Sequence, residues 1–279
     1  MPELPEVESI CRDLRPVLKG QAIKSALVRR RDLRVPFPKG LAAKLAGRKI
    51  TRVARRAKYI LVHLDSAQTL VLHLGMSGRI LIQEEDYKPQ KHDHFMIILE
   101  GGRKIVFNDP RRFGVVHLID EDEMKTHSAF LHLGPEPLSN QFSGPVLAAA
   151  LKGKKTAVKT AIMDQRIVVG VGNIYASESL FMAGIDPARL AGAIRNDEAE
   201  SLAGAIRAVL DKAIRAGGST LRDYRRIGGE AGSFQNHFAV YDKEGRPCPG
   251  CICDIGKTGG VRRIVQGGRS TFYCPGKQG

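Results

Sequence analysis

The beginning of the chain carries apolar side chains at the spacing of an amphipathic helix. They recur every three or four residues, so they share one face that a core can cover. Gly20 follows the last of them and is a typical helix stop. The apolar positions of this predicted helix are Leu4, Val7, Cys11, Leu14 and Leu18.

Beyond this helix the pattern changes to the alternation of apolar and polar side chains that is typical of strands. The stretch "HFMIILEGGRKIVF" is divided by Gly101-Gly102, which predicts a hairpin turn. Residues 21–120 are therefore expected to form mostly antiparallel strands, in a sandwich covered by the first helix. The alternating stretches are residues 50–64, 69–82 and 94–107.

The second half of the chain begins with "LHLGPEPLSNQFSGP", whose Pro, Gly, Ser and Asn residues predict a linker between domains. The pattern that follows is helical, and its longest stretch ends at Gly217-Gly218. A glycine-rich segment then leads to a cysteine-bearing tail that is expected to form a hairpin. The sequence thus predicts an α+β protein. Its later helical stretches are residues 145–153, 156–165, 173–184 and 197–218.

Charge and cysteines suggest the partner and the compartment. The 279 residues include 44 Lys and Arg against 29 Asp and Glu, and a net charge of +15 favours nucleic acid as partner over a membrane surface. No run of 18 apolar residues, signal core or lipidation tail is present, so we expect an intracellular protein. Cys11 is expected to be buried and reduced. The other four cysteines lie within the last 32 residues and suggest metal binding.

The opening "MPELPEVE" allows two interpretations. In the first, Pro2 and the nearby glutamates only begin a helix, because proline suits the first turn and carboxylates suit the positive end of the helix dipole. In the second, removal of Met1 leaves Pro2 with a free secondary amine beside Glu3. Such an amine is a candidate nucleophile for imine chemistry, with the carboxylate as proton donor.

Two predicted loops carry side chains that are unusual for plain turns. "LGMSG" contains Met76, and "NDPRRFG" contains Arg111 and Phe113. Together they have the composition of a DNA wedge, in which apolar groups fill a vacated stack and an arginine bonds an orphaned base. Separately, a lone Met or Phe is more often a core residue, and a lone Arg is more often a solvated surface charge.

Two further stretches give weaker signals. "KHDH" places His92 and His94 two residues apart, which favours a strand entry or a phosphate contact over a metal site, since no further ligand is near in sequence. "VVGVGNIYASE" is rich in glycine before a helix and offers backbone N–H groups to a phosphate, although an ordinary turn between helices has the same composition.

Taken in order, the motifs resemble those of one family, the bacterial formamidopyrimidine-DNA glycosylases. The shared motifs are "MPELPEVE", "AKYIL", "LGMSG", "KHDH", "DPRRFG", "VGVGNIYASESLF", "GGSTLRDY" and "GRSTFYC", and they cover nearly the whole chain. The resemblance implies a DNA repair enzyme that excises oxidised purines, chiefly 8-oxoguanine and formamidopyrimidines, from double-stranded DNA and then nicks the strand by β,δ-elimination. It also implies a helix-two-turns-helix element and a zinc-finger-type hairpin. The expected domains are residues 1–132, 133–230 and 238–278.

The resemblance also implies roles for particular residues. Pro2 is the expected Schiff-base nucleophile, Glu3 the acid, and Lys58 the proton donor for β-elimination, with Glu6 in support. Arg269 is expected to bind phosphate and assist δ-elimination. DNA contacts are expected from His92, Arg111, Lys154 and Asn173, and the flipped nucleotide's place is expected to be filled by Met76, Arg111 and Phe113. The loop expected to close over the lesion comprises Ser219, Thr220, Leu221, Arg222, Asp223 and Tyr224.

The cysteine tail departs from the family. Relatives carry two CxxC pairs sixteen residues apart, whereas here 22 residues separate Cys251 from Cys274, and Lys277 stands at the fourth position. A protonated lysine cannot bind zinc, so Cys253 is the better substitute. We therefore expect one structural zinc, with a three-sulfur or metal-free hairpin as alternatives. The expected ligands are Cys248, Cys251, Cys253 and Cys274.

Two other functions remain open at this point. An enzyme resembling endonuclease VIII uses the same amine chemistry on oxidised pyrimidines, but its chain begins with MPEGPE and its wedge residues differ. A non-catalytic damage-binding protein is the other alternative, and the presence of Pro2, Glu3 and Lys58 is evidence against it. We further expect a monomer in the bacterial cytoplasm, associated with the nucleoid through DNA and with no membrane contact.

Overall fold

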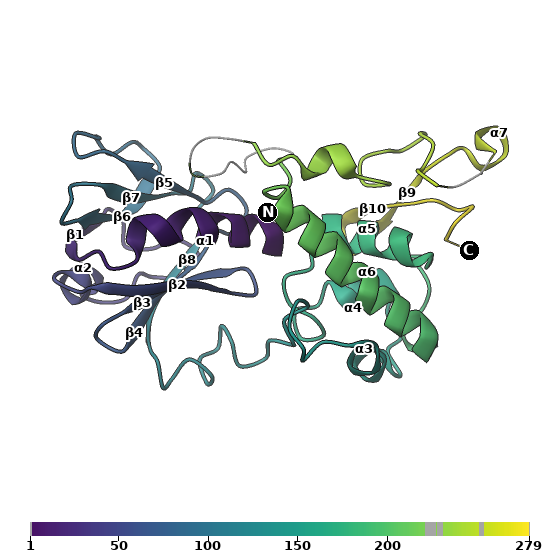
Figure 1. The fold of residues 1–279 in the computed structure, drawn as a ribbon, viewed down its shortest axis with the longest axis horizontal. Helices are drawn as coiled ribbons and strands as arrows, with labels where there is room; N and C mark the ends of the chain where they lie inside the picture. Colours follow the sequence, from purple (N-terminus) through teal and green to yellow (C-terminus); the bar gives the residue numbers. More distant parts are fainter. Residues whose placement is uncertain (1, 221–226, 228–230, 251–253, 279) are drawn as a thin grey trace. The chain divides into compact units, whose positions relative to one another are not determined.

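The computed structural model describes residues 2–220, 227, 231–250 and 254–278 (Figure 1). The chain divides into two compact units. The first consists of Met1–Leu131 and Gly217–Gly232, and the second of His132–Ala216 and Ser233–Gly279. None of the helices in the described ranges combines the length and the apolar character that a membrane span requires.

Two four-stranded antiparallel sheets form most of the first unit. Their strands are β1 Ile23–Val28, β2 Ile50–Arg56, β3 Tyr59–Leu64, β4 Gln68–His73, β5 Arg79–Gln83, β6 Asp93–Leu99, β7 Lys104–Asn108 and β8 Val115–Asp120. One sheet has the order β1-β6-β7-β5 and the other β2-β3-β4-β8 (Figure 1). Apolar side chains of both sheets meet in one core. The prediction of antiparallel strands is confirmed, including the turn at Gly101 and Gly102 between β6 and β7.

Helix α1, Leu4–Leu18, packs its predicted apolar face into this core, and all five predicted positions are buried. Two hydrogen bonds fasten it to β2: Arg15 Nε donates to the carbonyl of Val53 at 3.2 Å, and Cys11 Sγ to that of Ala54 at 3.4 Å. Truncating a buried leucine of this kind to alanine costs about 2–5 kcal/mol. A short helix, α2 Leu41–Leu45, completes the unit and was not predicted.

Helices and one hairpin form the second unit. The helices are α3 Gly144–Leu151, α4 Val158–Ile162, α5 Asn173–Ala183, η1 Ala191–Ala193, α6 Asn196–Arg215, η2 Phe234–His237 and α7 Ile255–Thr258. Their ends follow local rules, since Ser143 accepts a bond from the Val146 N–H at the start of α3 and Gly184 adopts a left-handed conformation after α5. The predicted tail hairpin is confirmed as antiparallel β9 Arg262–Gln266 and β10 Arg269–Tyr273.

A buried carboxylate ties the segment after η2 to α5. Glu178 accepts the backbone N–H groups of Ala239, Val240 and Tyr241 at 2.8, 3.0 and 2.8 Å. A small apolar cluster continues from there to the hairpin and includes Phe181 and Phe272. The hairpin is therefore anchored on the helical core by α5.

Candidate functional site: a helix end, two loops and a hairpin

The N-terminal end of α1 gathers two of the predicted catalytic residues, Pro2 and Glu3, and the predicted supporting residue Glu6. Pro2 is buried and precedes the helix, Glu3 is the N-cap, and the proline inside the first turn is Pro5. The first interpretation of the sequence placed Pro2 in the first turn of the helix. In the structure Pro2 instead precedes the N-cap. The Glu3 N–H donates to Glu6 Oε2 at 2.8 Å, so Glu6 satisfies a backbone group that the helix leaves unbonded.

Glu6 also holds the segment that enters the predicted lesion loop. Its Oε1 accepts the Ser219 N–H at 2.8 Å and the Ser219 hydroxyl at 3.2 Å. Gly218 has a φ of +80° and lies so close that a Cβ there would be 2.9 Å from Glu6 Oε1. Thr220 accepts the Gly232 N–H at 2.9 Å. The remaining residues of the predicted loop, Leu221, Arg222, Asp223 and Tyr224, lie outside the described residues.

Lys58 lies in the turn between β2 and β3 and not within a strand, as its alternating surroundings had suggested. The turn depends on Ala57, which has a φ of +51°, and Arg55 Nη1 donates to its carbonyl at 2.9 Å. Only 6% of Lys58 is exposed, so it is not a solvated surface lysine. Its charge acts on His73: burial, then Lys58, then Arg34 lower the pKa of His73 to about 4.

Topology brings the two wedge loops together. We call residues 74–78, between β4 and β5, the first wedge loop, and residues 109–114, between β7 and β8, the second wedge loop. Each crosses from one sheet to the other, β4 pairs with β8, and β5 pairs with β7. The two crossings must therefore run side by side at the same end of the sandwich.

The exposed tips of these loops carry the predicted wedge residues. Met76 and Phe113 are each 42% exposed, although both are large and apolar. The Arg111 guanidinium lies 5.0 Å from the centre of the Phe113 ring, within cation–π range. Next to them, His92 is partly exposed and its backbone carbonyl accepts the Asp109 N–H at 2.9 Å. Apolar tips beside a cation have the composition that insertion into a base stack requires.

In the second unit, Asn173 lies at the first position of α5 and is held by its neighbours. Its side-chain N–H donates to the Ser270 carbonyl at 2.9 Å and to the Tyr241 hydroxyl at 3.2 Å. Lys159, which is 1% exposed, donates to Asn173 Oδ1 at 2.6 Å and to Thr271 Oγ1 at 2.7 Å. Sequence reasoning missed Lys159, because nothing in "TAVKTAI" distinguishes a buried lysine from a solvated one.

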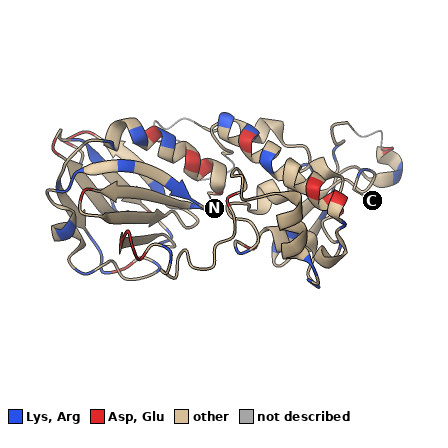
Figure 2. Ribbon diagram, turned by 60° about the horizontal axis from the view of Figure 1, so that its bottom comes forward, with Lys and Arg blue, Asp and Glu red and all other residues tan. Residues whose placement is uncertain are grey.

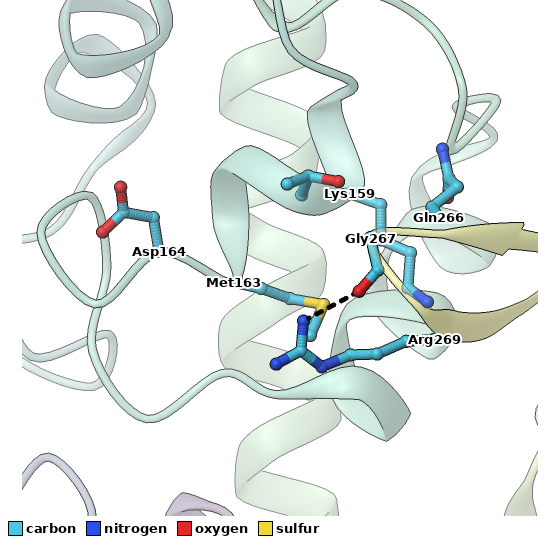
Figure 3. Close-up of a pocket in the computed structure, with 7 residues that line it drawn as sticks. Lys159, Met163, Asp164, Gln266, Gly267 and Arg269 are labelled. Carbon is cyan, nitrogen blue, oxygen red and sulfur yellow. Dashed lines mark hydrogen bonds between the residues drawn. The ribbon is translucent and has the colours of Figure 1, made fainter.

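Arg269 lies at the start of β10 and lines a pocket of about 230 Å³ (Figure 3). Its guanidinium is exposed and donates to the Gly267 carbonyl at 3.5 Å. Lys159, Met163 and Gln266 line the same pocket. Lys154, the other cation predicted to contact DNA in the second unit, is partly exposed in the connection between α3 and α4.

Basic residues are spread over loops and strands of both units, whereas helices α1 and α6 carry both signs (Figure 2). On the helices the charges form local pairs such as Glu8–Arg12 at 3.4 Å and Asp211–Arg215. Such pairs cancel locally, so the helices contribute little to the net positive charge. The excess is available on the loops, where a polyanion can reach it.

Two of the four predicted zinc ligands, Cys248 and Cys274, lie among the described residues of the cysteine hairpin. Cys248 Sγ and Cys274 Sγ lie 3.2 Å apart, and both are buried. Lys277 is directed elsewhere, with its Nζ 4.2 Å from the centre of the Phe181 ring. Cys251 and Cys253 lie outside the described residues, and among the described ones no group of three or more metal-ligating side chains occurs.

Comparisons with known proteins identify the family of the chain. The chain matches the formamidopyrimidine-DNA glycosylase N-terminal domain over residues 1–116 and the H2TH domain of the same family over residues 133–225. It is 50% identical over 285 residues to a formamidopyrimidine-DNA glycosylase of Cereibacter sphaeroides, covering 99% of both chains.

Solved structures give the same result. The crystal structure of MutM (Fpg) from Thermus thermophilus matches with a TM-score of 0.86 and 40% identity, covering 99% of this chain and 98% of that one. Two complexes of Lactococcus lactis Fpg with DNA, one with an abasic site and one with Fapy-dG, match with TM-scores of 0.88 at 31% and 30% identity, covering 99% of each chain.

The chain belongs to the formamidopyrimidine-DNA glycosylase family. It is a DNA-binding base-excision-repair enzyme with glycosylase and abasic-site lyase activity. The α+β fold predicted from the sequence is confirmed by the same matches.

Proposed function

We propose that the enzyme acts as a monomer on double-stranded DNA and removes oxidised purines, 8-oxoguanine and formamidopyrimidines, with Pro2 as the nucleophile. The observation that carries this proposal is the arrangement at the start of α1, where Pro2 is buried beside the N-cap Glu3 and Glu6 is fixed by two backbone N–H groups. The Fapy-dG in the Lactococcus lactis complex supports a purine lesion as substrate.

The chemistry needs an amine. The Pro2 nitrogen attacks C1′ of the damaged nucleotide, the bond to the base breaks, and the departing base takes up a proton from solvent. The nitrogen then loses its proton, and the C1′–O4′ bond breaks as Glu3 supplies a proton to O4′. The resulting iminium is an electron sink that acidifies the C2′ proton. Loss of that proton expels the 3′-phosphate, and a second elimination expels the 5′-phosphate. A hydroxyl nucleophile could displace the base but could not form the iminium, so one group can serve both steps only if it is an amine.

Lys58 and Arg269 would assist the eliminations. Lys58 is buried in its turn, and burying a charged ammonium is costly unless polar groups take up its protons. We assign it the proton transfer in β-elimination. Arg269 is exposed on a hairpin edge and offers a planar cation to a phosphate, which would support δ-elimination.

DNA would be bound by residues of both units. His92 and Arg111 would contact the strands beside the wedge of Met76 and Phe113, and Lys154 and Asn173 would contact the backbone. The abasic-site DNA bound by the Lactococcus lactis enzyme supports this use of the fold. The division into domains at residues 1–132, 133–230 and 238–278, the lesion loop from Ser219 to Tyr224, and the cytoplasmic location are part of the same proposal.

The hairpin would hold one structural zinc. Zinc bound tetrahedrally at about 2.3 Å from each sulfur sets the sulfurs about 3.8 Å apart. The distance of 3.2 Å between Cys248 Sγ and Cys274 Sγ is within a small adjustment of that geometry. Lys277 faces an aromatic ring, which supports Cys251 and Cys253 as the remaining ligands. The metal would fix the hairpin and would take no part in the reaction.

Borohydride trapping tests the proposal. With a duplex that contains 8-oxoguanine, reduction should join the protein covalently to DNA, and an uncleaved extension before Pro2 should abolish the adduct. An extension of the same length at the C-terminus is the matched control and should trap normally. Trapping by the N-terminally extended protein would refute Pro2 as nucleophile, and faster processing of oxidised pyrimidines would favour the endonuclease VIII-like alternative.

A further inference from the structure

A buried carboxylate joins the two wedge loops. Asp109 is 0% exposed, and both of its oxygens are used: Oδ1 accepts the Ser77 hydroxyl of the first wedge loop at 2.6 Å, and Oδ2 accepts the Gly114 N–H at the far end of the second wedge loop at 2.8 Å. Ser77 Oγ in turn accepts the Arg111 N–H at 3.1 Å. The serine hydroxyl therefore bonds both the start and the tip of the second wedge loop.

The backbone around this carboxylate is fixed as well. The Asp109 N–H donates to the His92 carbonyl at 2.9 Å, and the ring nitrogen Nε2 of His94 lies 2.9 Å from the Asp109 carbonyl. The Arg112 N–H donates to the same carbonyl at 3.3 Å and closes a turn in which Arg112 has a φ of +58°. Asp109 thus lies where the turn that carries His92, just before β6, meets the first wedge loop and the second wedge loop.

The loops also touch through their backbones. Gly75 has a φ of +60°, and a Cβ there would lie 2.4 Å from the Phe113 backbone carbon. A Cβ at Gly114 would lie 2.5 Å from the ring of Phe107. Only glycine fits at these two points, so the loop that carries Met76 and the loop that carries Phe113 cannot move independently without breaking contacts.

A wedge requires this kind of support. The exposed apolar tips gain contacts only when bases are separated, and separating them opposes the insertion. A loop that could yield would bend away from the stack, and ordering it at that moment would weaken binding to the lesion. Support from buried, fully used hydrogen-bonding groups keeps the tips in place before DNA arrives.

We infer that Asp109 and Ser77 are positioning residues that brace the wedge, so that Met76, Arg111 and Phe113 enter the DNA as one rigid element. The inference rests on the proposed role of those three residues. The brace itself touches no DNA in this assignment, because Asp109 and Ser77 are both buried. Its effect is specific to substrates that contain a stack to be opened.

Ser77→Ala is the main test, because it removes the shared hydroxyl and leaves the bond between Asp109 and Gly114 in place. We expect affinity for a lesion-containing duplex to fall by about 10-fold or more, because the variant loses the two hydrogen bonds of the Ser77 hydroxyl, and affinity for undamaged duplex to change less than about 2-fold. Cleavage of a single-stranded abasic oligonucleotide should stay within about 2-fold, since no stack must be opened there. Asp109→Asn should show the same selectivity.

Two further variants make the test specific. Thr69→Val removes another buried hydroxyl of the same unit. Thr69 lies on β4, and its hydroxyl is 2.9 Å from His63 Nδ1. This variant should leave the lesion selectivity unchanged. Phe113→Ala should lower lesion binding selectively by itself. The double variant S77A/F113A should then lose less than the sum of the two single losses, because the brace then positions only Met76 and Arg111.

The outcomes separate the two proposals. If F113A is selective for the lesion but S77A and D109N weaken every substrate alike, or none, the brace is refuted and the wedge stands. If F113A weakens lesion and undamaged duplexes equally, the wedge role is refuted and the brace with it. Additive losses in the double variant would also refute the brace.

Discussion

The start of α1 and the cysteine hairpin each carry a residue that we propose takes part in the reaction, Pro2 and Arg269, but the two are held by different means. At α1, Glu6 accepts backbone N–H groups from residues 3 and 219, and the helix behind it is buried in a core shared by two sheets. The hairpin has strands of five residues and a small apolar cluster. A helix end on a large core maintains its own geometry, whereas a small hairpin needs a clip such as a metal.

This difference explains where the chain departs from its relatives. At the start of α1 the sequence carries the family motif "MPELPEVE", and Glu6 of this motif is bonded to residues 3 and 219. In the hairpin the fourth cysteine position holds Lys277, whose ammonium packs on Phe181 and not beside the sulfurs. A zinc site that holds only this hairpin can change its ligand residues as long as the hairpin stays closed.

The largest expected effect concerns the well-held site. Lys58→Met keeps the length of the buried side chain and removes its proton, so strand cleavage at a preformed abasic site should slow by about 100-fold, within the range for a lost proton-transfer group. Borohydride trapping should persist, because Pro2 still forms the iminium. The exposed Lys49→Met is the matched control. Unchanged cleavage by Lys58→Met would show that this lysine is structural.

A second effect should appear as acid sensitivity of the first unit. Burial and the charges of Lys58 and Arg34 lower the pKa of His73 to about 4, so between pH 6.5 and 4 the unfolded chain binds a proton that the folded one does not. The stability present above pH 6.5 is therefore lost as pH falls toward 4, by about 2 kcal/mol at pH 4.5.

Thermal melts at pH 7 and 4.5 measure that loss. His73→Gln should lose less stability than the wild type over this interval, while the exposed His132→Gln should behave as the wild type. An equal loss in His73→Gln and the wild type would mean that His73 does not carry the acid sensitivity.

In the hairpin we expect the geometry to depend on the bound zinc. Elemental analysis should find close to one zinc per chain, and Cys253→Ser should lower zinc content and weaken DNA binding by about 10-fold, because Arg269 loses its support. Lys277→Cys restores the family's four-cysteine set, and in that background Cys253→Ser should be harmless. Cys11→Ala, in the core of the first unit, is the control and should retain zinc. Full zinc retention in Cys253→Ser alone would place the fourth ligand elsewhere.

The smallest effect should come from the contact between Lys277 and Phe181. Lys277→Ala removes a cation–π pair on the surface, worth about 0.5–1 kcal/mol, and should lower the melting temperature by a few degrees. Lys277→Arg should restore most of it. Lys257→Ala, on the exposed α7, is the comparison and should have no effect. A loss of the same size in both alanine variants would show that the contact is not specific.

The sequence by itself determined the elements that follow from local rules. The period of the apolar residues in α1, the alternation along the strands, the glycines between β6 and β7, and the final hairpin were all predicted, because each depends on neighbours in the chain. The motifs also identified the family, since their residues and order are specific even where their geometry is unknown.

Only the tertiary structure decided which polar residues are buried and what they hold. Lys58, Asp109 and Lys159 lie in stretches whose local pattern fits a strand, a turn and a helix surface, yet all three are buried. Their burial arises from distant partners: Asp109 meets Ser77 because two sheet-crossing loops run side by side, and Lys159 meets Thr271 across more than a hundred residues. A local pattern records the period of a segment, whereas the partners of a buried charge depend on how the chain returns to it.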